Sequence, residues 1–514
     1  MSHWIIVPIV LPALMAPFIV LAMRHDLLLQ RVFSAASSVV LLAVALGLLG
    51  RAAGNPPEVY QLGNWIAPFG IVLVLDRLSA LMVLLTAILA VVVVLYAITS
   101  RWDERGRHFH ALFQFQLMGI NGAFLTGDVF NLFVFFEVLL IASYGLMLHG
   151  GGTARMKAGV QYVVVNLGGS TLFLIAVGTL YGVTGTLNMA DLAVKVPLVP
   201  AGDQALLRVG GLLLLVVFAV KAALVPIHFW LPGTYANAPA PVAALFAIMT
   251  KVGAYAIIRV YTLAFGAEAG EDAWLAADWL LPAALVTLIV GMVGVLGAKA
   301  LTRLVCFSVI GSMGTLLTAV AIFTPDATVA ALYYLIHSTF AGAALFLLAD
   351  LVTERRGGAG DRLVAAPRFA QSGLLAAMFF LAAIGMAGMP PLTGFIGKLM
   401  VLDSARASES MVTIWAVVLV TSLIAMVGFA RAGSMVFWKS AAIPGPSDEV
   451  PPSRPATPIV AAAAMLAGMV ALAVFAGPVT GYLEATAAGL YDPSDYIGAV
   501  LGPDTLASHL QSAR

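Results

Sequence analysis

The stretch LLLLVVFAVKAALVPIHFWLPGTYANAPAPVAALFAIMTKVGAYAIIR, from Leu212 to Arg259, decides how this chain folds. It holds two segments apolar enough to cross a bilayer, with Lys221 in the first and Lys251 in the second. Pro226 and Pro232 follow Lys221, and because proline lacks a backbone N–H and clashes with the preceding turn, the first helix is expected to break there. A broken helix deep in a membrane persists only where protein or water binds the freed carbonyls. The stretch therefore predicts ion handling beside a hydrated cavity, not simple anchoring.

The composition predicts an all-α polytopic membrane protein. Hydrophobic residues make up 61% of the 514 residues, charged residues only 10%, and the mean hydropathy is +1.02, far above the values of soluble domains. The formal net charge is +1 and no long basic run occurs, so nucleic acid is not expected as a partner. The single cysteine, Cys306, excludes an internal disulfide and a thiolate-held metal centre. We read the first apolar stretch, from Trp4, as a retained span, because it lacks a basic leader and a cleavage site.

Fourteen segments have about the 20 residues that a bilayer core of ~30 Å requires. The expected spans are Trp4 to Met23, Val32 to Leu49, Ile71 to Thr99, Ala111 to Leu125, Val129 to Leu148, Ala158 to Val183, Leu206 to Trp230, Pro241 to Phe265, Trp274 to Gly297, Leu304 to Phe323, Val329 to Val352, Ser372 to Val401 (interrupted), Met411 to Phe437 and Pro458 to Leu483.

Loop charges predict the orientation of the chain. Basic residues fall in alternate loops, whereas the intervening loops are neutral or acidic. By the positive-inside rule, the basic loops are cytoplasmic and both termini lie outside the bacterial cytoplasmic membrane. The basic residues are Arg24, Arg31, Arg101, Arg105, Arg107, Arg155, Lys157, Lys299, Arg303, Arg355, Arg356, Arg362 and Arg368.

A second interrupted helix suggests internal symmetry. The twelfth span carries GMPPLTGFIGK, in which Pro390 and Pro391 precede Lys398. It lies five spans after the broken seventh, which is the pattern of an inverted repeat of helices 4–8 and 9–13. We therefore divide the chain into residues 1–110 (helices 1–3), 111–265 (first repeat), 266–437 (second repeat) and 438–514 (helix 14 and tail).

Few ionisable side chains are expected near mid-membrane. Glu137, in FVFFEVLLIASYGLML, lies ~13 Å deep and Lys251 ~15 Å deep at 1.5 Å per residue, with Lys221 comparably central. A lysine at the centre of a membrane helix costs about 2.5–3.5 kcal/mol on insertion scales. A carboxylate at this depth takes up a proton unless a lysine lies beside it. A structural ion pair is the alternative to a transport role for Glu137 and Lys221, and Lys398 follows a break of unknown geometry.

A histidine completes the series. His337, in ALYYLIHSTFAGA, suits proton transfer at physiological pH, and its alternative role is that of a hydrogen-bonded core residue. His228 beside the first break and Asp350 near a cytoplasmic end are possible auxiliary groups. Because lysine is a poor metal ligand and the carboxylates do not cluster, this set indicates a proton relay with no metal site. No phosphate loop, nucleophile elbow or haem-ligand pair occurs, so we expect a transporter with no cofactor, not an enzyme.

The motifs around Glu137, around Lys221 and Lys251, and around Lys398 resemble the antiporter-like subunits of the complex I superfamily. Within that superfamily the chain is similar to the D subunits of the Mrp-type multisubunit cation/proton antiporters. The resemblance implies fourteen helices with an inverted repeat, a functional glutamate in helix 5 (Glu137) and functional lysines in helices 7, 8 and 12 (Lys221, Lys251 and Lys398). It also implies other subunits, the lipid bilayer, protons and monovalent cations such as Na⁺ or K⁺ as partners.

Two alternatives remain open from the sequence. One is the homologous proton-pumping subunit of a respiratory NADH dehydrogenase or membrane-bound hydrogenase; one such paralogue has glutamate where Lys398 stands, and another has lysine. The other is a non-conducting scaffold that holds partner subunits, although the cost of four buried ionisable groups argues against it.

Overall fold

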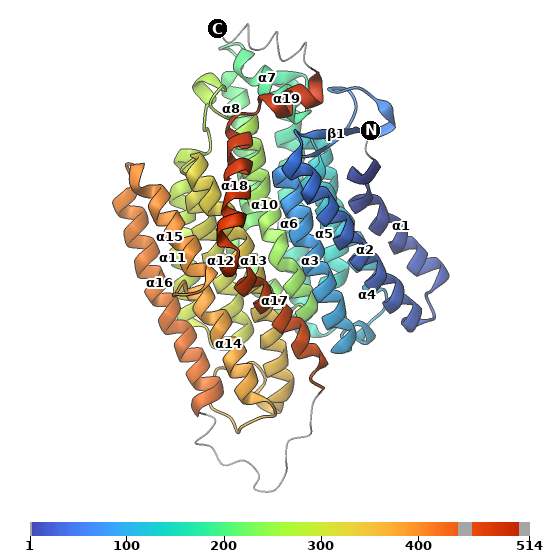
Figure 1. Cartoon of the computed structure of the whole chain (residues 1–514), viewed down its shortest axis with the longest axis vertical. Coiled ribbons are helices and arrows are strands. Elements are labelled where there is room, and N and C mark those ends of the chain that lie inside the picture. Colours follow the sequence, from blue (N-terminus) through green and yellow to red (C-terminus); the bar gives the residue numbers. More distant parts are fainter. Residues whose placement is uncertain (1–2, 440–454, 503–514) are drawn as a thin grey trace.

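The computed structural model describes residues 3–439 and 455–502 as a bundle in which most helices run along the long axis (Figure 1). In the described part of the chain, eleven helices are long and apolar enough to cross a membrane, and two shorter apolar helices, Val7–Ala22 and Ser372–Ala387, accompany them. The expectation of an all-α polytopic membrane protein is therefore confirmed.

Most helix bounds lie within a few residues of the expected spans. The first group is α1 (Val7–Ala22), α2 (Leu27–Gly54) and α3 (Arg77–Thr99). The second is α4 (Phe109–Leu125), α5 (Val129–Met147), α6 (Thr153–Thr184), α7 (Met189–Lys195), α8 (Gln204–Ala222), α9 (Trp230–Asn237) and α10 (Ala240–Leu263). The third is α11 (Ala277–Gly297), α12 (Leu301–Val320), α13 (Pro325–Arg355), α14 (Ser372–Ala387), α15 (Thr393–Ser404) and α16 (Met411–Gly433). The last is α17 (Thr457–Val474), α18 (Ala476–Tyr491) and α19 (Ser494–Leu501).

The third expected span begins later than its hydropathy indicates. Residues Val72–Leu75 form strand β2, which pairs antiparallel with β1 (Glu58–Gln61), and this VLVL run has the β-branched residues typical of strands. Helix α3 begins only at Arg77, because the Asp76 side chain accepts a hydrogen bond of 2.8 Å from the Ser79 N–H and caps the helix. The hairpin lies with α7 and α19 at one end of the bundle (top of Figure 1).

The last expected span is two helices, not one. Helices α17 and α18 are separated at Phe475. Pro478 lies in the first turn of α18, where its ring would clash with the carbonyl of Val474 if one straight helix continued. Helix α19 follows in the region expected to be a tail, and residues 440–454 and 503–514 of the expected C-terminal unit lie outside the described residues.

Both expected helix breaks are present, and the helices around them pack in a repeated order. In the first set, α4 contacts α5 and α6 contacts α8. The matching contacts in the second set are α11 with α12, and α13 with α14 and α15. Helix α10 contacts α8 and α4 as α16 contacts α14 and α11. The breaks follow α8 in one set and α14 in the other. This order is that of a repeat, and the opposite direction of its two halves stays a prediction.

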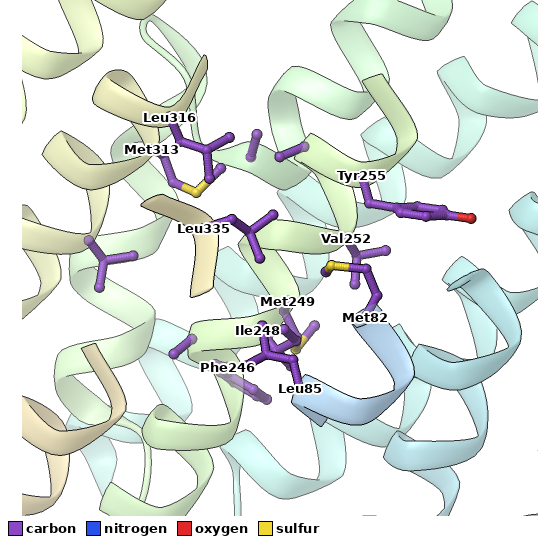
Figure 2. Close-up of a cluster of buried hydrophobic side chains, with 14 of the residues drawn as sticks. Met82, Leu85, Phe246, Ile248, Met249, Val252, Tyr255, Met313, Leu316 and Leu335 are labelled. Carbon is purple, nitrogen blue, oxygen red and sulfur yellow. The ribbon is translucent and has the colours of Figure 1, made fainter. Parts of the chain in front are cut away.

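Helices α10 and α13 form the centre of the bundle. The most apolar 18-residue window of each is wholly buried by other helices. Figure 2 shows Phe246, Ile248, Met249 and Val252 of α10 among side chains from α3, α12 and α13. Because these two windows are enclosed, a polar group within them faces protein and not lipid.

Candidate functional site

The first helix break is stabilised by hydrogen bonds from outside the helix. Helix α8 ends as Ala223 adopts a left-handed conformation with φ 55°. The Val220 carbonyl then accepts a hydrogen bond of 3.1 Å from the Trp230 indole N–H. The Val225 N–H donates to the Thr287 hydroxyl of α11 at 2.9 Å. The polar backbone that a break exposes thus has protein partners, as burial in a membrane requires.

The two prolines of this segment have different positions. Pro226 lies in the break itself, between Ala223 and the short 3-10 helix Ile227–Phe229 that contains half-buried His228. Pro232 differs from the expectation, because it lies inside the first turn of α9. An N–H has no intrahelical partner there, so proline is compatible with the helix and does not break it.

Lys221 lies in the last turn of α8, with only 6% of its surface exposed. Its Nζ donates a hydrogen bond of 2.8 Å to Oδ1 of Asn166 in α6. Glu137 of α5 is half-buried and accepts a hydrogen bond from the hydroxyl of Ser170, also in α6. Asn166 and Ser170 are four residues apart, so both face the same side of α6.

No ion pair joins Glu137 to Lys221, although the structure describes both residues. The Glu137 charge nevertheless acts on Lys221 electrostatically, and Lys221 Nζ lies 5.7 Å from the ring centroid of Phe136, the residue next to Glu137. Helix α6 therefore connects the two charges through Asn166 and Ser170. The direct structural pair that the sequence left open is absent from this arrangement.

Lys251 of α10 is wholly buried, and its Nζ has no hydrogen-bond partner among the described residues. Two residues further along, Gly253 lies against the backbone of α8. A Cβ at this position would be 2.7 Å from the Ala222 nitrogen and 2.8 Å from the Phe218 carbonyl oxygen. Only glycine permits this approach, and it brings the helix of Lys251 into direct contact with the helix of Lys221.

The second break positions Lys398. Helix α14 ends before Gly388, which has φ 81°, and α15 begins at Thr393; Pro390 and Pro391 lie exposed between them. Lys398 folds back so that its Nζ donates to the Ala387 carbonyl at 2.9 Å and to the Ser422 hydroxyl of α16 at 2.8 Å. Its ammonium group thus binds a carbonyl at the C-terminal end of α14, where the helix dipole favours positive charge.

His337 connects the two halves of the site. It is wholly buried in α13, and its Nδ1 lies 2.7 Å from the Thr393 hydroxyl at the start of α15. The charges of Lys398 and Lys251 both act on it electrostatically. Because α13 contacts both α10 and α15, His337 lies between Lys251 of the first set of helices and Lys398 of the second.

Asp350 lies apart from this central group. It is 13 residues after His337 on α13, which corresponds to about 20 Å along the helix. Its Oδ2 accepts hydrogen bonds from the Tyr96 hydroxyl at 2.7 Å and the Trp102 indole N–H at 2.8 Å. The structure therefore places Asp350 at one end of the bundle, and it brings Lys221, Lys251, His337 and Lys398 onto touching helices.

Sequence reasoning missed the neutral partners of these charges. Asn166 and Ser170 lie four residues apart in an apolar helix, and this spacing was a usable signal because it puts two polar groups on one face. Thr393 and Ser422 gave no such signal, since a lone hydroxyl in a membrane helix can bond its own backbone.

Comparisons with known proteins agree with this arrangement. The family described as "NADH:quinone oxidoreductase/Mrp antiporter, TM" matches residues 126–425. The chain is 41% identical to the D subunit of a probable K(+)/H(+) antiporter of Rhizobium meliloti (strain 1021), over 98% of each chain. It is 38% identical to the D subunit of a Na(+)/H(+) antiporter of Bacillus subtilis (strain 168), over 98% of this chain and 100% of the relative. It is also similar to a chain of the Mrp complex from Dietzia sp. DQ12-45-1b, with a TM-score of 0.86, 29% identity and coverage of 98% and 100%. The chain therefore belongs to the NADH:quinone oxidoreductase/Mrp antiporter transmembrane family.

Proposed function

We propose that this chain is the proton-translocating subunit of a multisubunit monovalent cation/proton antiporter. The observation that carries the proposal is the row of buried ionisable groups, Lys221, Lys251, His337 and Lys398, on the touching helices α8, α10, α13 and α15. Glu137 joins this row through α6. Buried charges of this kind are expensive in a membrane and mark ion pathways.

The hydrogen bonds suggest how the relay works. Lys221 and Lys398 have acceptors that stabilise their charged forms, whereas Lys251 between them has none. Because like charges in a poorly screened interior repel, protonation of one lysine favours loss of the proton from the next. A proton can therefore advance as neutral and charged lysines alternate, with His337 transferring it between Lys251 and Lys398.

Orientation and domain division are part of the same proposal. We place the basic loops in the cytoplasm and both ends of the chain outside the bacterial cytoplasmic membrane. The units are residues 1–110, 111–265, 266–437 and 438–514, with the middle two as inverted repeats. The repeated order of helix contacts supports the two central units.

The decisive experiment uses vesicles that contain the whole complex and a pH-sensitive dye. Glu137→Gln and Lys221→Ala should abolish cation-dependent proton movement while the complex still assembles. Lys157→Ala, which removes an exposed lysine, is the control and should transport normally. Normal transport by both relay variants would leave a scaffold as the better interpretation, and a flavin or iron–sulfur arm among co-purified subunits would favour a redox-driven complex.

A further inference from the structure

A polar face of α10 continues beyond Lys251 toward the end of the bundle that we predict to lie outside. Lys251, Tyr255 and Arg259 follow at intervals of four residues, so they lie on one face and span about 12 Å at 1.5 Å per residue. Tyr255 is 1% exposed and Arg259 3% exposed. The hydroxyl of Tyr255 points away from the apolar cluster drawn in Figure 2. The relay described above uses Lys251 but neither Tyr255 nor Arg259.

Hydrogen bonds connect Tyr255 and Arg259, but not Lys251, to a carboxylate at the bundle end. The Tyr255 hydroxyl donates to the Phe124 carbonyl at 2.7 Å and accepts from Arg259 Nε at 3.4 Å. Arg259 also forms a two-point ion pair with Asp76, with nitrogen–oxygen distances of 2.6 and 2.8 Å. Such fork-shaped pairs fix both side chains in position.

The ion pair borders a pocket at the outer end. Asp76 lines this pocket together with Arg77, Asp495 and Tyr496. The Tyr496 side chain is 4% exposed, and its hydroxyl is buried without a hydrogen-bond partner among the described residues. The Arg259 guanidinium lies 5.2 Å from the centroid of the Tyr496 ring. Tyr496 thus supplies a free hydroxyl between the buried ion pair and the pocket.

Asp76 is ionised at rest in this setting and is therefore able to accept a proton. Burial alone would raise the pKa of Asp76, but the charge and hydrogen bonds of Arg259, with the hydrogen bonds from Ser79, outweigh burial and hold that pKa below its usual range. A second carboxylate, Asp128, acts electrostatically on Tyr496, and burial raises the pKa of Asp128 to about 6. Arg77 and Asp495 border the same pocket. The cluster therefore combines a carboxylate held ionised, a second carboxylate that titrates near neutrality and a guanidinium that cannot give up its proton.

We propose that this face of α10 is the outward leg of the proton path, with Asp76 as the carboxylate that exchanges protons with the outside and Arg259 as its positioning residue. The proposal rests on the function proposed above. Tyr255 is the next hydrogen-bonding group after Lys251, and its hydroxyl both accepts and donates. Arg259 does not relay the proton, because its guanidinium does not give up its own. Asp76 neutralises its charge, so that a proton leaving Lys251 does not meet an uncompensated positive charge.

The test compares variants of the whole complex in vesicles, with proton movement followed by a pH dye. Asp76→Asn should slow transport about tenfold or more, because it leaves a buried guanidinium unpaired and removes the acceptor. Asp76→Glu keeps the carboxylate and should restore most of the rate. Glu58→Gln removes the carboxylate of another arginine pair at the same end, Arg51–Glu58 at 2.6 Å, and should leave the rate unchanged.

A charge-neutral double variant separates transport from structure. Asp76→Asn with Arg259→Gln leaves no buried charge unpaired, so the complex should assemble normally but remain slow. Normal transport by the assembled double variant would show that the pair is only a structural tie and would overturn the proposal. Arg259→Gln alone should move the dependence of the rate on external pH toward higher pH, since the pKa of Asp76 rises without its partner; an unchanged dependence would also contradict it.

Lys221→Ala in the same preparation separates the two proposals. If Lys221→Ala is inactive while Asp76→Asn transports normally, the relay stands and only the outward leg is overturned. If Lys221→Ala is active as well, the proposed function itself has failed.

Discussion

The hydrogen bond between Asn166 and Lys221 offers a quantitative test of the relay. Asn166→Leu removes the acceptor that stabilises the charged form of Lys221 in a buried site. A hydrogen bond to a charged group contributes about 1.5–3 kcal/mol, and about 1.36 kcal/mol corresponds to one pH unit. The neutral form of Lys221 is then favoured, so the alkaline limb of the transport profile should move about one to two units toward lower pH.

Asn166→Asp should have the opposite effect. A carboxylate at the same place stabilises the charged lysine, so the alkaline limb should move to higher pH and the maximal rate should fall as the proton is held more tightly. The assay is dye-monitored proton movement in vesicles containing the whole complex, measured between about pH 6 and 9.5. Thr171→Val, on the exposed side of the same helix, is the control. Unchanged profiles in both Asn166 variants would refute the view that Lys221 changes its charge during transport.

Four further predictions address packing, orientation, a buried carboxylate and the cation. A Cβ at Gly394 would overlap the Gly385 carbonyl oxygen of α14, so Gly394→Ala should cost about 1–3 kcal/mol of stability and lower the thermal midpoint in detergent. The control Gly373→Ala, with open space around it, should not lower the midpoint. Equal midpoints for the two variants would contradict this packing. Cysteine introduced at exposed Gly358 should react with an impermeant thiol reagent only from the cytoplasm, and at exposed Gly202 only from outside, and the reverse labelling would invert the topology. Burial raises the pKa of Asp128 above its unfolded value, to about 6, so the stability that this group costs grows between about pH 4 and about pH 6 and stays at its full size above that. Asp128→Asn should therefore raise the thermal midpoint at about pH 8 and not at about pH 4. Equal effects at both would argue against a titrating carboxylate. The chain alone in liposomes should not exchange sodium for protons, because hard cations prefer several oxygen ligands and the central carboxylate, Glu137, lies among lysines. Rapid exchange without partner subunits would place the cation site in this chain.

Hydropathy and proline positions predicted most of the helices, since a membrane span has a length requirement that apolar runs reveal directly. They failed where the apolar run was not a helix. The residues of β2 are as hydrophobic as a span, and the capping hydrogen bond to Asp76 that ends the strand region depends on the local backbone. The division of the last span required attention to Pro478, which the hydropathy average conceals.

The ionisable residues of the site were predictable because a charge in an apolar run is conspicuous. Their partners were not, since contacts such as Asn166 with Lys221 join residues 55 positions apart. The sequence also predicted attraction between Glu137 and Lys221 without indicating that both have their hydrogen-bond partners on α6. The positions of Asp76 and Arg259, 183 residues apart, depend on tertiary packing that no local pattern records.

The enclosure of α10 also constrains how the chain is made. This helix carries Lys251, and an isolated helix would expose that lysine to lipid at a cost of about 2.5–3.5 kcal/mol near the bilayer centre. Its covering helix α13 begins at Pro325, well after α10 ends at Leu263. We therefore expect α10 to depend on its earlier neighbours α8 and α3 until α13 has been synthesised. A ribosome stalled before Pro325 would leave α10 loosely inserted and accessible to membrane proteases, whereas release after α13 would protect it.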